Sequence, residues 1–150
     1  MNDSSDSTCP ARADLIRYID AQQSVYEQAL SELRSGRKQS HWMWFIFSQI
    51  AGLGHSSTSQ YYALRGLDEA RAYLSDPVLG ARLLECTNVV IAIEGRSALD
   101  IFGGIDEMKF RSSMTLFSQV AGPESIFQQA LDKYFAGEED HRTLKILDSF

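Results

Sequence analysis

Cysteine and histidine are scarce in this chain, which has two cysteines and three histidines among 150 residues. Cys9 lies in a polar N-terminal stretch and Cys86 in an apolar helical pattern, so we expect no disulfide framework. No Cys-x-x-Cys or His-Glu-x-x-His spacing occurs, and we therefore predict no metal site and no resident cofactor. Two of the histidines, His55 and His141, lie in polar surroundings and are expected to face solvent.

Long apolar runs and an excess of positive charge are also missing. No stretch approaches the roughly 18 apolar residues that a membrane-spanning helix needs. Residues 1–8 are acidic and polar, unlike the basic and then apolar start of a signal peptide, so we expect a cytoplasmic protein. The formal net charge of -6 argues against nucleic-acid and membrane partners, although it leaves room for a locally basic pocket.

The rest of the composition is that of a globular protein, with 44% hydrophobic and 23% charged residues. Residues 1–12 are rich in Ser, Asp and Thr, and we predict a disordered tail there and a single domain over residues 13–150. Apolar residues then recur at helical spacing between glycine-containing breaks, and no two segments form a convincing strand pair. The sequence predicts an all-α bundle of about eight helices.

Polar residues that can cap a helix mark several predicted helix starts: Ser24 (with Glu27 as a capping box), Ser40, Asp76, Ser97 and Asp106. Asp76 is followed by proline, which fits the first helical position, and opens the helix that we expect to be the longest, closed by Gly95. Gly36 and Gly137 are predicted to stop the helices that precede them.

The segment 37–49 holds both tryptophans of the chain, two phenylalanines and one histidine. From Trp42 to Phe47 every side chain is apolar, so a helix there would have no polar face and should be buried. A strand is the competing interpretation, because aromatic residues favour strands. We predict a helix, since the neighbouring segments are helical and no partner strand is available.

Two clusters could carry chemistry, and we predict that their members, the two tryptophans included, bind a ligand. An indole beside a cation suits a planar, anionic ligand such as a nucleotide. For each tryptophan alone, however, burial in the core is the commoner role. The first cluster consists of Lys38, His41, Trp42, Trp44 and Gln49.

The second cluster consists of Asp106, Lys109, Ser112 and Ser113, in which a lysine and two hydroxyl groups share one helix face. Such a set could bind phosphate near a helix start. The simpler alternative is that Asp106 caps the helix and Lys109 is solvated. No base lies within sequence reach of the serine pair, so a serine nucleophile is not predicted.

Several runs of the sequence resemble the bacterial domain-of-unknown-function family numbered 1810, over about residues 14–147. They are His-Trp-Met-Trp-Phe-Ile-Phe at 41–47, Gly-Leu-Gly at 52–54, Glu-Ala-Arg-Ala-Tyr-Leu at 69–74 and Ser-Ser-Met-Thr-Leu-Phe at 112–117, with Lys38, Gln49, Pro77, Phe102, Gly103, Asp106 and Lys109. The resemblance implies a mainly helical single domain without an established activity. Some members are labelled calpastatin-like, but a disordered inhibitor would lack this much patterned apolar surface. Ser48 stands where the family usually has proline, which predicts a softer bend after the central helix.

Our functional hypothesis is a small-molecule site in which a tryptophan stacks on a ring, Lys38 and Lys109 bind an anion, and Asp106 orients or polarises the ligand. The mixture of Trp, His, Gln and Lys is similar to a motif of a helical family that processes ADP-ribose glycosides, although the Glu-His pair of that motif is absent here. An ADP-ribose-type ligand, with hydrolysis of its glycosidic bond, would fit. The alternative is a non-enzymatic module that binds a protein through an exposed aromatic patch.

Overall fold

The computed structural model describes residues 12–149, and in these residues the chain is all-α, as predicted. The predicted tail falls almost entirely on residues outside this range. No strand forms within residues 12–149, where a single isolated bridge joins Ile50 and Leu64. The helices are α2 (Arg12–Gln23), α3 (Tyr26–Arg34), α4 (Met43–Ile46), α5 (Ser57–Tyr61), α6 (Leu67–Ser75), α7 (Leu79–Ala92), α8 (Ala98–Phe102), α9 (Gly104–Ala121), α10 (Ile126–Phe135) and α11 (His141–Asp148).

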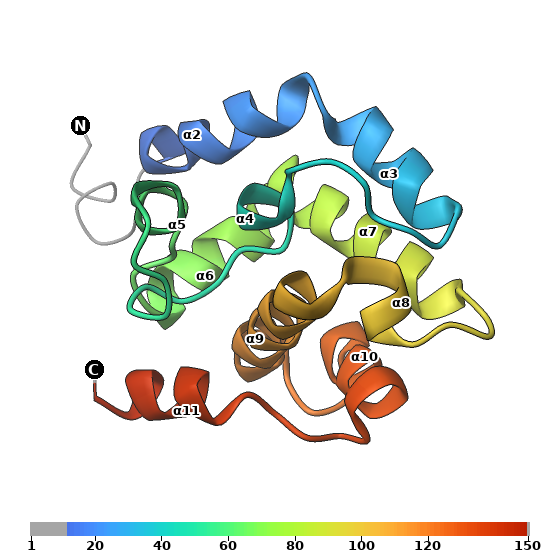
Figure 1. The fold of residues 1–150 in the computed structure, drawn as a ribbon. Helices are drawn as coiled ribbons and strands as arrows, with labels where there is room; N and C mark the ends of the chain where they lie inside the picture. Colours follow the sequence, from blue (N-terminus) through green and yellow to red (C-terminus); the bar gives the residue numbers. More distant parts are fainter. Residues whose placement is uncertain (1–11, 150) are drawn as a thin grey trace, which may run out of the picture.

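Helix α9 lies in the middle of the molecule and contacts α4, α6, α8, α10 and α11 (Figure 1). Helices α2 and α3 run along one side of the bundle and α11 lies along the opposite side (Figure 1). Phe110, Met114 and Phe117 of α9 are fully buried, and so are neighbouring residues on its other faces. A helix buried on most of its faces must be surrounded by other helices, which is why α9 forms the centre.

The central segment forms a helix, but a short one. Helix α4 has one turn and begins after Trp42, so the predicted cap at Ser40 is wrong. Its burial is as expected only in part, because Met43 and Ile46 are 1% exposed whereas Trp44 and Phe45 are half-buried. Ser48 donates a hydrogen bond from its Oγ to the carbonyl of Trp44 at 2.9 Å and so closes the turn.

Aromatic contacts attach this segment to the centre of the bundle. The ring of Phe47 lies 5.0 Å from that of Phe110 in an edge-to-face arrangement, and Phe102 stacks on Phe110 at 4.6 Å. The backbone N–H of Lys38 also donates to the carbonyl of Ile101 in α8 at 2.7 Å. These contacts place residues 38–47 directly beside the first turns of α9.

The predicted helix starts are partly confirmed. Ser97 forms a capping box with Asp100 at the start of α8. The Asp76 carboxylate accepts hydrogen bonds from the backbone N–H groups of residues 78 and 79, although α7 itself begins only at Leu79. The capping box at Ser24 is wrong, because the chain turns directly from α2 into α3 and Val25 becomes the N-cap.

The start of α9 also differs from the prediction. Its N-cap is Gly103, with a φ of 86°, and Asp106 lies inside the first turn rather than at the cap. A positive φ is readily adopted only by glycine, so the helix can begin there without a polar cap. With 18 residues α9 is the longest of the described helices, whereas α7, predicted to be the longest, has 14.

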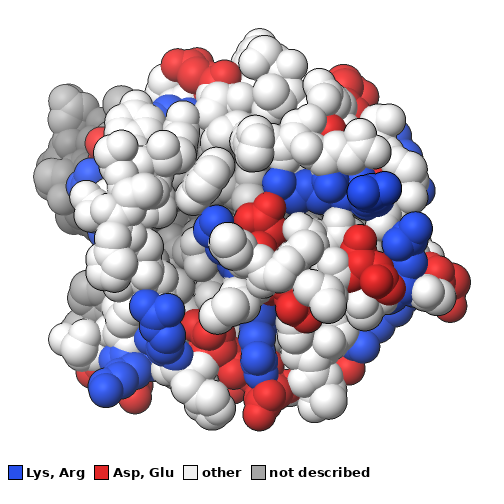
Figure 2. Space-filling view, in the orientation of Figure 1, with Lys and Arg blue, Asp and Glu red and all other residues white. Residues whose placement is uncertain are grey.

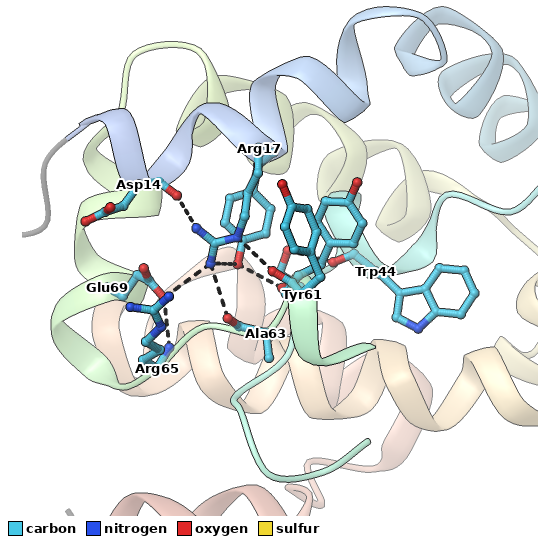
Figure 3. Close-up of polar contacts among 10 residues, drawn as sticks. Asp14, Arg17, Trp44, Tyr61, Ala63, Arg65 and Glu69 are labelled. Atoms are coloured by element: carbon cyan, nitrogen blue, oxygen red, sulfur yellow. Dashed lines mark hydrogen bonds and ion pairs between the residues drawn. The ribbon is translucent and has the colours of Figure 1, made fainter. Parts of the chain in front are cut away.

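Arg17 forms a polar centre that joins α2 to the connection between α5 and α6 (Figure 3). Its Nε donates to the carbonyl of Tyr61 at 2.8 Å and an Nη to that of Ala63 at 3.4 Å. The same guanidinium lies 3.7 Å from the Glu69 carboxylate. Figure 3 also shows the indole of Trp44 pointing away from this cluster. We therefore assign Arg17 a structural role.

The described residues contain one cysteine, Cys86. Cys86 is a free and buried thiol, and burial raises its pKa to about 12, whereas Cys9 lies outside the described residues. Between residues 12 and 149, no three His, Cys, Asp or Glu side chains gather as metal ligands would. No helix in the same range is long and apolar enough to cross a membrane. Charges of both signs are interspersed on the face shown in Figure 2.

Candidate functional site

The two clusters chosen from the sequence meet in space at one carboxylate. Asp106 Oδ2 lies 2.8 Å from Lys38 Nζ, and Asp106 Oδ1 lies 3.4 Å from Lys109 Nζ. Two ammonium groups share one carboxylate, which leaves a net charge of +1 on the group. The Lys38 side chain is only 7% exposed, so little water screens the pair with Asp106.

A hollow of about 440 Å³, which we call the first hollow, opens beside this carboxylate. Its volume falls in the range of small-molecule sites. The first two residues of α9, Gly104 and Ile105, form part of its wall, where a helix start has free N–H groups. Its lining residues are Lys38, His41, Met43, Trp44, Gly104, Ile105, Asp106 and Lys109.

Trp44 and Lys109 form the aromatic and cationic wall of the first hollow. The Lys109 ammonium lies 4.8 Å from the centre of the indole ring, within the range of a cation–π contact. Trp44 is half-buried, and its indole N–H forms no hydrogen bond with any residue from 12 to 149. This wall therefore holds an indole, whose N–H forms no hydrogen bond with the described residues, and an ammonium group that contacts its ring.

Lys38 contributes mainly to the architecture of the hollow. Besides its ion pair with Asp106, its Nζ donates to the carbonyl of Ser40 at 2.5 Å and lies 5.2 Å from the ring centre of Trp42. These partners hold the ammonium group in place. Lys109 has only the longer contact with Asp106 and the ring of Trp44, so Lys109 is the cation better able to bind a ligand.

Glu32 of α3 holds the chain that forms the wall, and sequence analysis missed it. Its Oε1 accepts hydrogen bonds from the backbone N–H groups of Gln39 and Ser40 and from the Trp42 indole, at 2.8–2.9 Å. Its Oε2 accepts from the Ser40 hydroxyl at 2.5 Å. Burial by itself would raise the pKa of Glu32, but these hydrogen bonds outweigh it and lower the pKa to about 2.

This pKa predicts an acid-dependent contribution to stability. Because the pKa is 4.5 in the unfolded chain and about 2 in the folded one, the ionised carboxylate stabilises the fold above pH 4.5, and the contribution is lost as the pH falls towards 2. We expect the difference in unfolding free energy between the wild type and Glu32→Gln to shrink by about 2 kcal/mol from pH 6 to pH 3. Urea titrations at both pH values measure it. A difference that stays constant between the two pH values would contradict the assignment.

A second hollow of about 180 Å³ adjoins the first, because Ile105 and Lys109 line both. Its walls come from α9, from the loop before α5 and from the start of α11. The remaining lining residues are Gln49, Leu53, Gly54, Ser59, Met108, Ser112, Asp140 and Arg142.

The structure separates the nine predicted site residues into three groups. Lys38, His41, Trp44, Asp106 and Lys109 line the first hollow. Gln49 and Ser112 line the second, together with Lys109.

Trp42 and Ser113 line neither hollow, and we remove them from the site. Trp42 is 1% exposed and its N–H donates to Glu32. This tryptophan therefore has the alternative role that we considered, burial in the core. Ser113 is fully buried on the inner side of α9, so the polar face predicted for this helix ends at Ser112.

Sequence analysis also missed Ile105, Met108 and Arg142. Ile105 and Met108 are 73% and 59% exposed although they are apolar. No local pattern distinguishes these two residues, because they flank Asp106, which we predicted to be a helix cap. Arg142 lies far along the chain, and only the packing of α11 against α9 brings it to the second hollow.

A larger hollow, of about 520 Å³, lies elsewhere, beside α6 and the start of α2. Within residues 12–149 no aromatic residue lines it, and two of its three acidic groups are engaged: Asp68 pairs with Arg71 at 3.0 Å, and Glu69 accepts from the backbone N–H of Arg65 at 2.9 Å. It borders the point where the described chain begins. We therefore base the functional argument on the two hollows at α9.

Comparisons with known proteins agree with the resemblance seen in the sequence. The family described as protein of unknown function (DUF1810) matches residues 12–147. The crystal structure of the conserved hypothetical protein Rv1873 from Mycobacterium tuberculosis is 47% identical in sequence, with a TM-score of 0.88. That match covers 90% of this chain and 96% of the other. Among curated proteins no match was found.

Proposed function

The chain belongs to the DUF1810 family of proteins of unknown function, and we propose a function for it from the geometry of the site. The protein binds a small anionic molecule that carries a planar ring, of the nucleotide or ADP-ribose type. The observation that carries the proposal is the position of the Lys109 ammonium between the Trp44 ring and the Asp106 carboxylate. The indole would stack on the ring of the ligand, and the ammonium group, which lies over the indole in this structure, would supply the positive charge.

The surroundings support an anionic rather than a cationic ligand. Lys38, Lys109 and Asp106 together carry a net positive charge, although the chain as a whole is acidic. The start of α9 at Gly104 adds backbone N–H donors and the positive end of a helix dipole. The wall at residues 38–42 is held by Glu32 and by Ile101, so little ordering is required when a ligand binds.

The proposal predicts a thermal shift that depends on the wall of the first hollow. We expect ADP-ribose and adenosine 5′-monophosphate to raise the melting temperature of the wild type. Trp44→Ala and Lys109→Gln should each weaken the affinity about tenfold, since each removes one of the two main contacts. Lys145→Gln, which removes an exposed lysine of α11, is the matched control and should change the affinity less than about twofold. A flat response of the wild type to the whole panel would contradict the proposal.

Hydrolysis of a glycosidic bond is a narrower proposal on the same site. Among residues 12–149, Asp106 is the one carboxylate that lines the first hollow, and it would orient a water or stabilise positive charge at the sugar carbon. Most glycosidases use two carboxylates, so binding is the part that the geometry supports best. The test measures the release of free ADP-ribose from an ADP-ribosylated substrate. We expect the wild type to release it and Asp106→Asn to lose this activity.

The alternative, a module that binds another protein, is favoured by the exposed apolar side chains of Leu99, Ile105 and Met108. Two of these three residues border the hollows, and a bound small molecule would cover them. The tryptophans do not form a flat exposed face, since Trp42 is buried and Trp44 lines a hollow. We therefore prefer the small-molecule site.

A further inference from the structure

The second hollow has a charge of its own. Arg142 and Lys109 bring two cationic groups to its wall, and Asp140 brings one anionic group. The Asp140 carboxylate is engaged at the start of α11, where it accepts hydrogen bonds from the backbone N–H and the hydroxyl of Thr143, at 2.9 and 2.6 Å. The Arg142 guanidinium is less engaged, because it makes one hydrogen bond, to the carbonyl of Leu53 at 3.2 Å. Lys109 contacts Asp106 and Trp44 on the side of the first hollow.

The uncharged polar groups of the second hollow fit the same chemistry. Gln49 is half-buried, and its side-chain amide forms no hydrogen bond with any other residue from 12 to 149. An amide in that position can donate two hydrogen bonds to a ligand. Together with Lys109 and Arg142, Gln49 makes this hollow rich in donors. Phosphate oxygens, which accept hydrogen bonds and carry charge, are the groups that such a set binds best, and arginine binds them with a fork of two N–H groups.

We propose that the second hollow is a phosphate subsite and that the ligand spans both hollows, with its ring on Trp44 and a phosphate between Lys109 and Arg142. This inference rests on the proposed function and deepens it, because it assigns the phosphate of the ligand to the second hollow and names Arg142 as a group that binds it. Lys109 belongs to both hollows and would contact the phosphate from the side of the ring. The exposed side chains of Ile105 and Met108 lie along this path and would pack against the sugar.

The experiment compares adenosine with adenosine 5′-diphosphate by isothermal titration calorimetry, using the full chain and four variants: Arg142→Gln, Arg142→Lys, Trp44→Ala and Arg96→Gln. Arg142→Gln should weaken the binding of the diphosphate about tenfold and change that of adenosine less than about twofold, because only the phosphate would reach Arg142. Arg142→Lys keeps the charge but loses the fork, and should lie between the two. Arg96→Gln removes an exposed arginine that lines neither hollow and is the matched control for net charge.

The outcomes separate the two proposals. One outcome is that the wild type binds the diphosphate and that Trp44→Ala weakens this binding whereas Arg142→Gln does not. In that case the phosphate subsite is overturned and the proposed function stands. Equal losses for adenosine and for the diphosphate in Arg142→Gln would also overturn the subsite, since they indicate a general disturbance of the fold. If the wild type binds neither compound, both proposals fail.

Discussion

Replacing Glu32 by alanine is expected to destabilise the protein by about 4 kcal/mol, measured as the loss of unfolding free energy in urea. The substitution removes the common acceptor of two backbone N–H groups and the Trp42 indole, and it leaves the buried indole N–H without a partner. A buried donor without an acceptor costs roughly 1–3 kcal/mol, and hydrogen bonds to a charged group are the stronger ones. The effect should therefore exceed that of removing an ordinary surface carboxylate.

The consequence extends to the site, because Glu32 fixes the chain that carries Lys38 and Trp44. We expect the fluorescence of Trp42 to shift to longer wavelength in Glu32→Ala as water reaches the indole. Glu32→Gln keeps the shape and should cost about 2 kcal/mol. The matched control is Glu27→Ala on the same helix, an exposed carboxylate that should matter by less than about 0.5 kcal/mol. Equal stability of Glu32→Ala and the control would show that the hydrogen bonds contribute nothing.

Gly80→Ala is expected to destabilise the protein by about 3 kcal/mol. Gly80 is buried in α7, at the point where the chain returns from α6, and a Cβ atom there would lie 2.0 Å from the carbonyl oxygen of Leu74. That oxygen belongs to the backbone, so the two helices would have to move apart. Inside a helix alanine is ordinarily better than glycine by about 1 kcal/mol, and the overlap must exceed this gain.

Thermal and urea unfolding of Gly80→Ala would measure the loss. The control is Gly66→Ala, where an added Cβ meets no atom within 4 Å and the φ of 164° is ordinary extended backbone. We expect the control to change the unfolding free energy by less than about 0.5 kcal/mol. A stabilising effect of Gly80→Ala would mean that α6 and α7 do not approach as closely as described.

The sequence was sufficient for features that depend on neighbours along the chain. Apolar spacing and glycine positions predicted an all-α domain, and Ser97 was correctly identified as a cap. The helix starts predicted at Ser24, Ser40 and Asp106 were wrong. Val25 is the N-cap in place of Ser24, Ser40 binds Glu32, and Asp106 pairs with two lysines. Asp106 in particular gains more from two ammonium groups than from capping a helix that glycine can start by itself.

The candidate site was only half predictable, and the two tryptophans illustrate why. Trp42 is the N-cap of α4 and is 1% exposed, whereas Trp44 lies inside the helix and is half-buried, so the two indoles do not share one role. Which of them entered the core depended on Glu32, whose carboxylate binds the Trp42 indole from another helix. No local pattern encodes that choice.

By itself, the sequence determined the helical class, the family and the residue types from which a site could be built, since helix formation follows from the period of apolar residues. The tertiary structure decided that Lys38 and Lys109 share Asp106, that Trp44 rather than Trp42 lines the first hollow, and that Arg142 reaches the second. The physical reason is that these contacts join segments far apart in the chain, and their positions are set by the packing of Phe47 and Phe110 in the core.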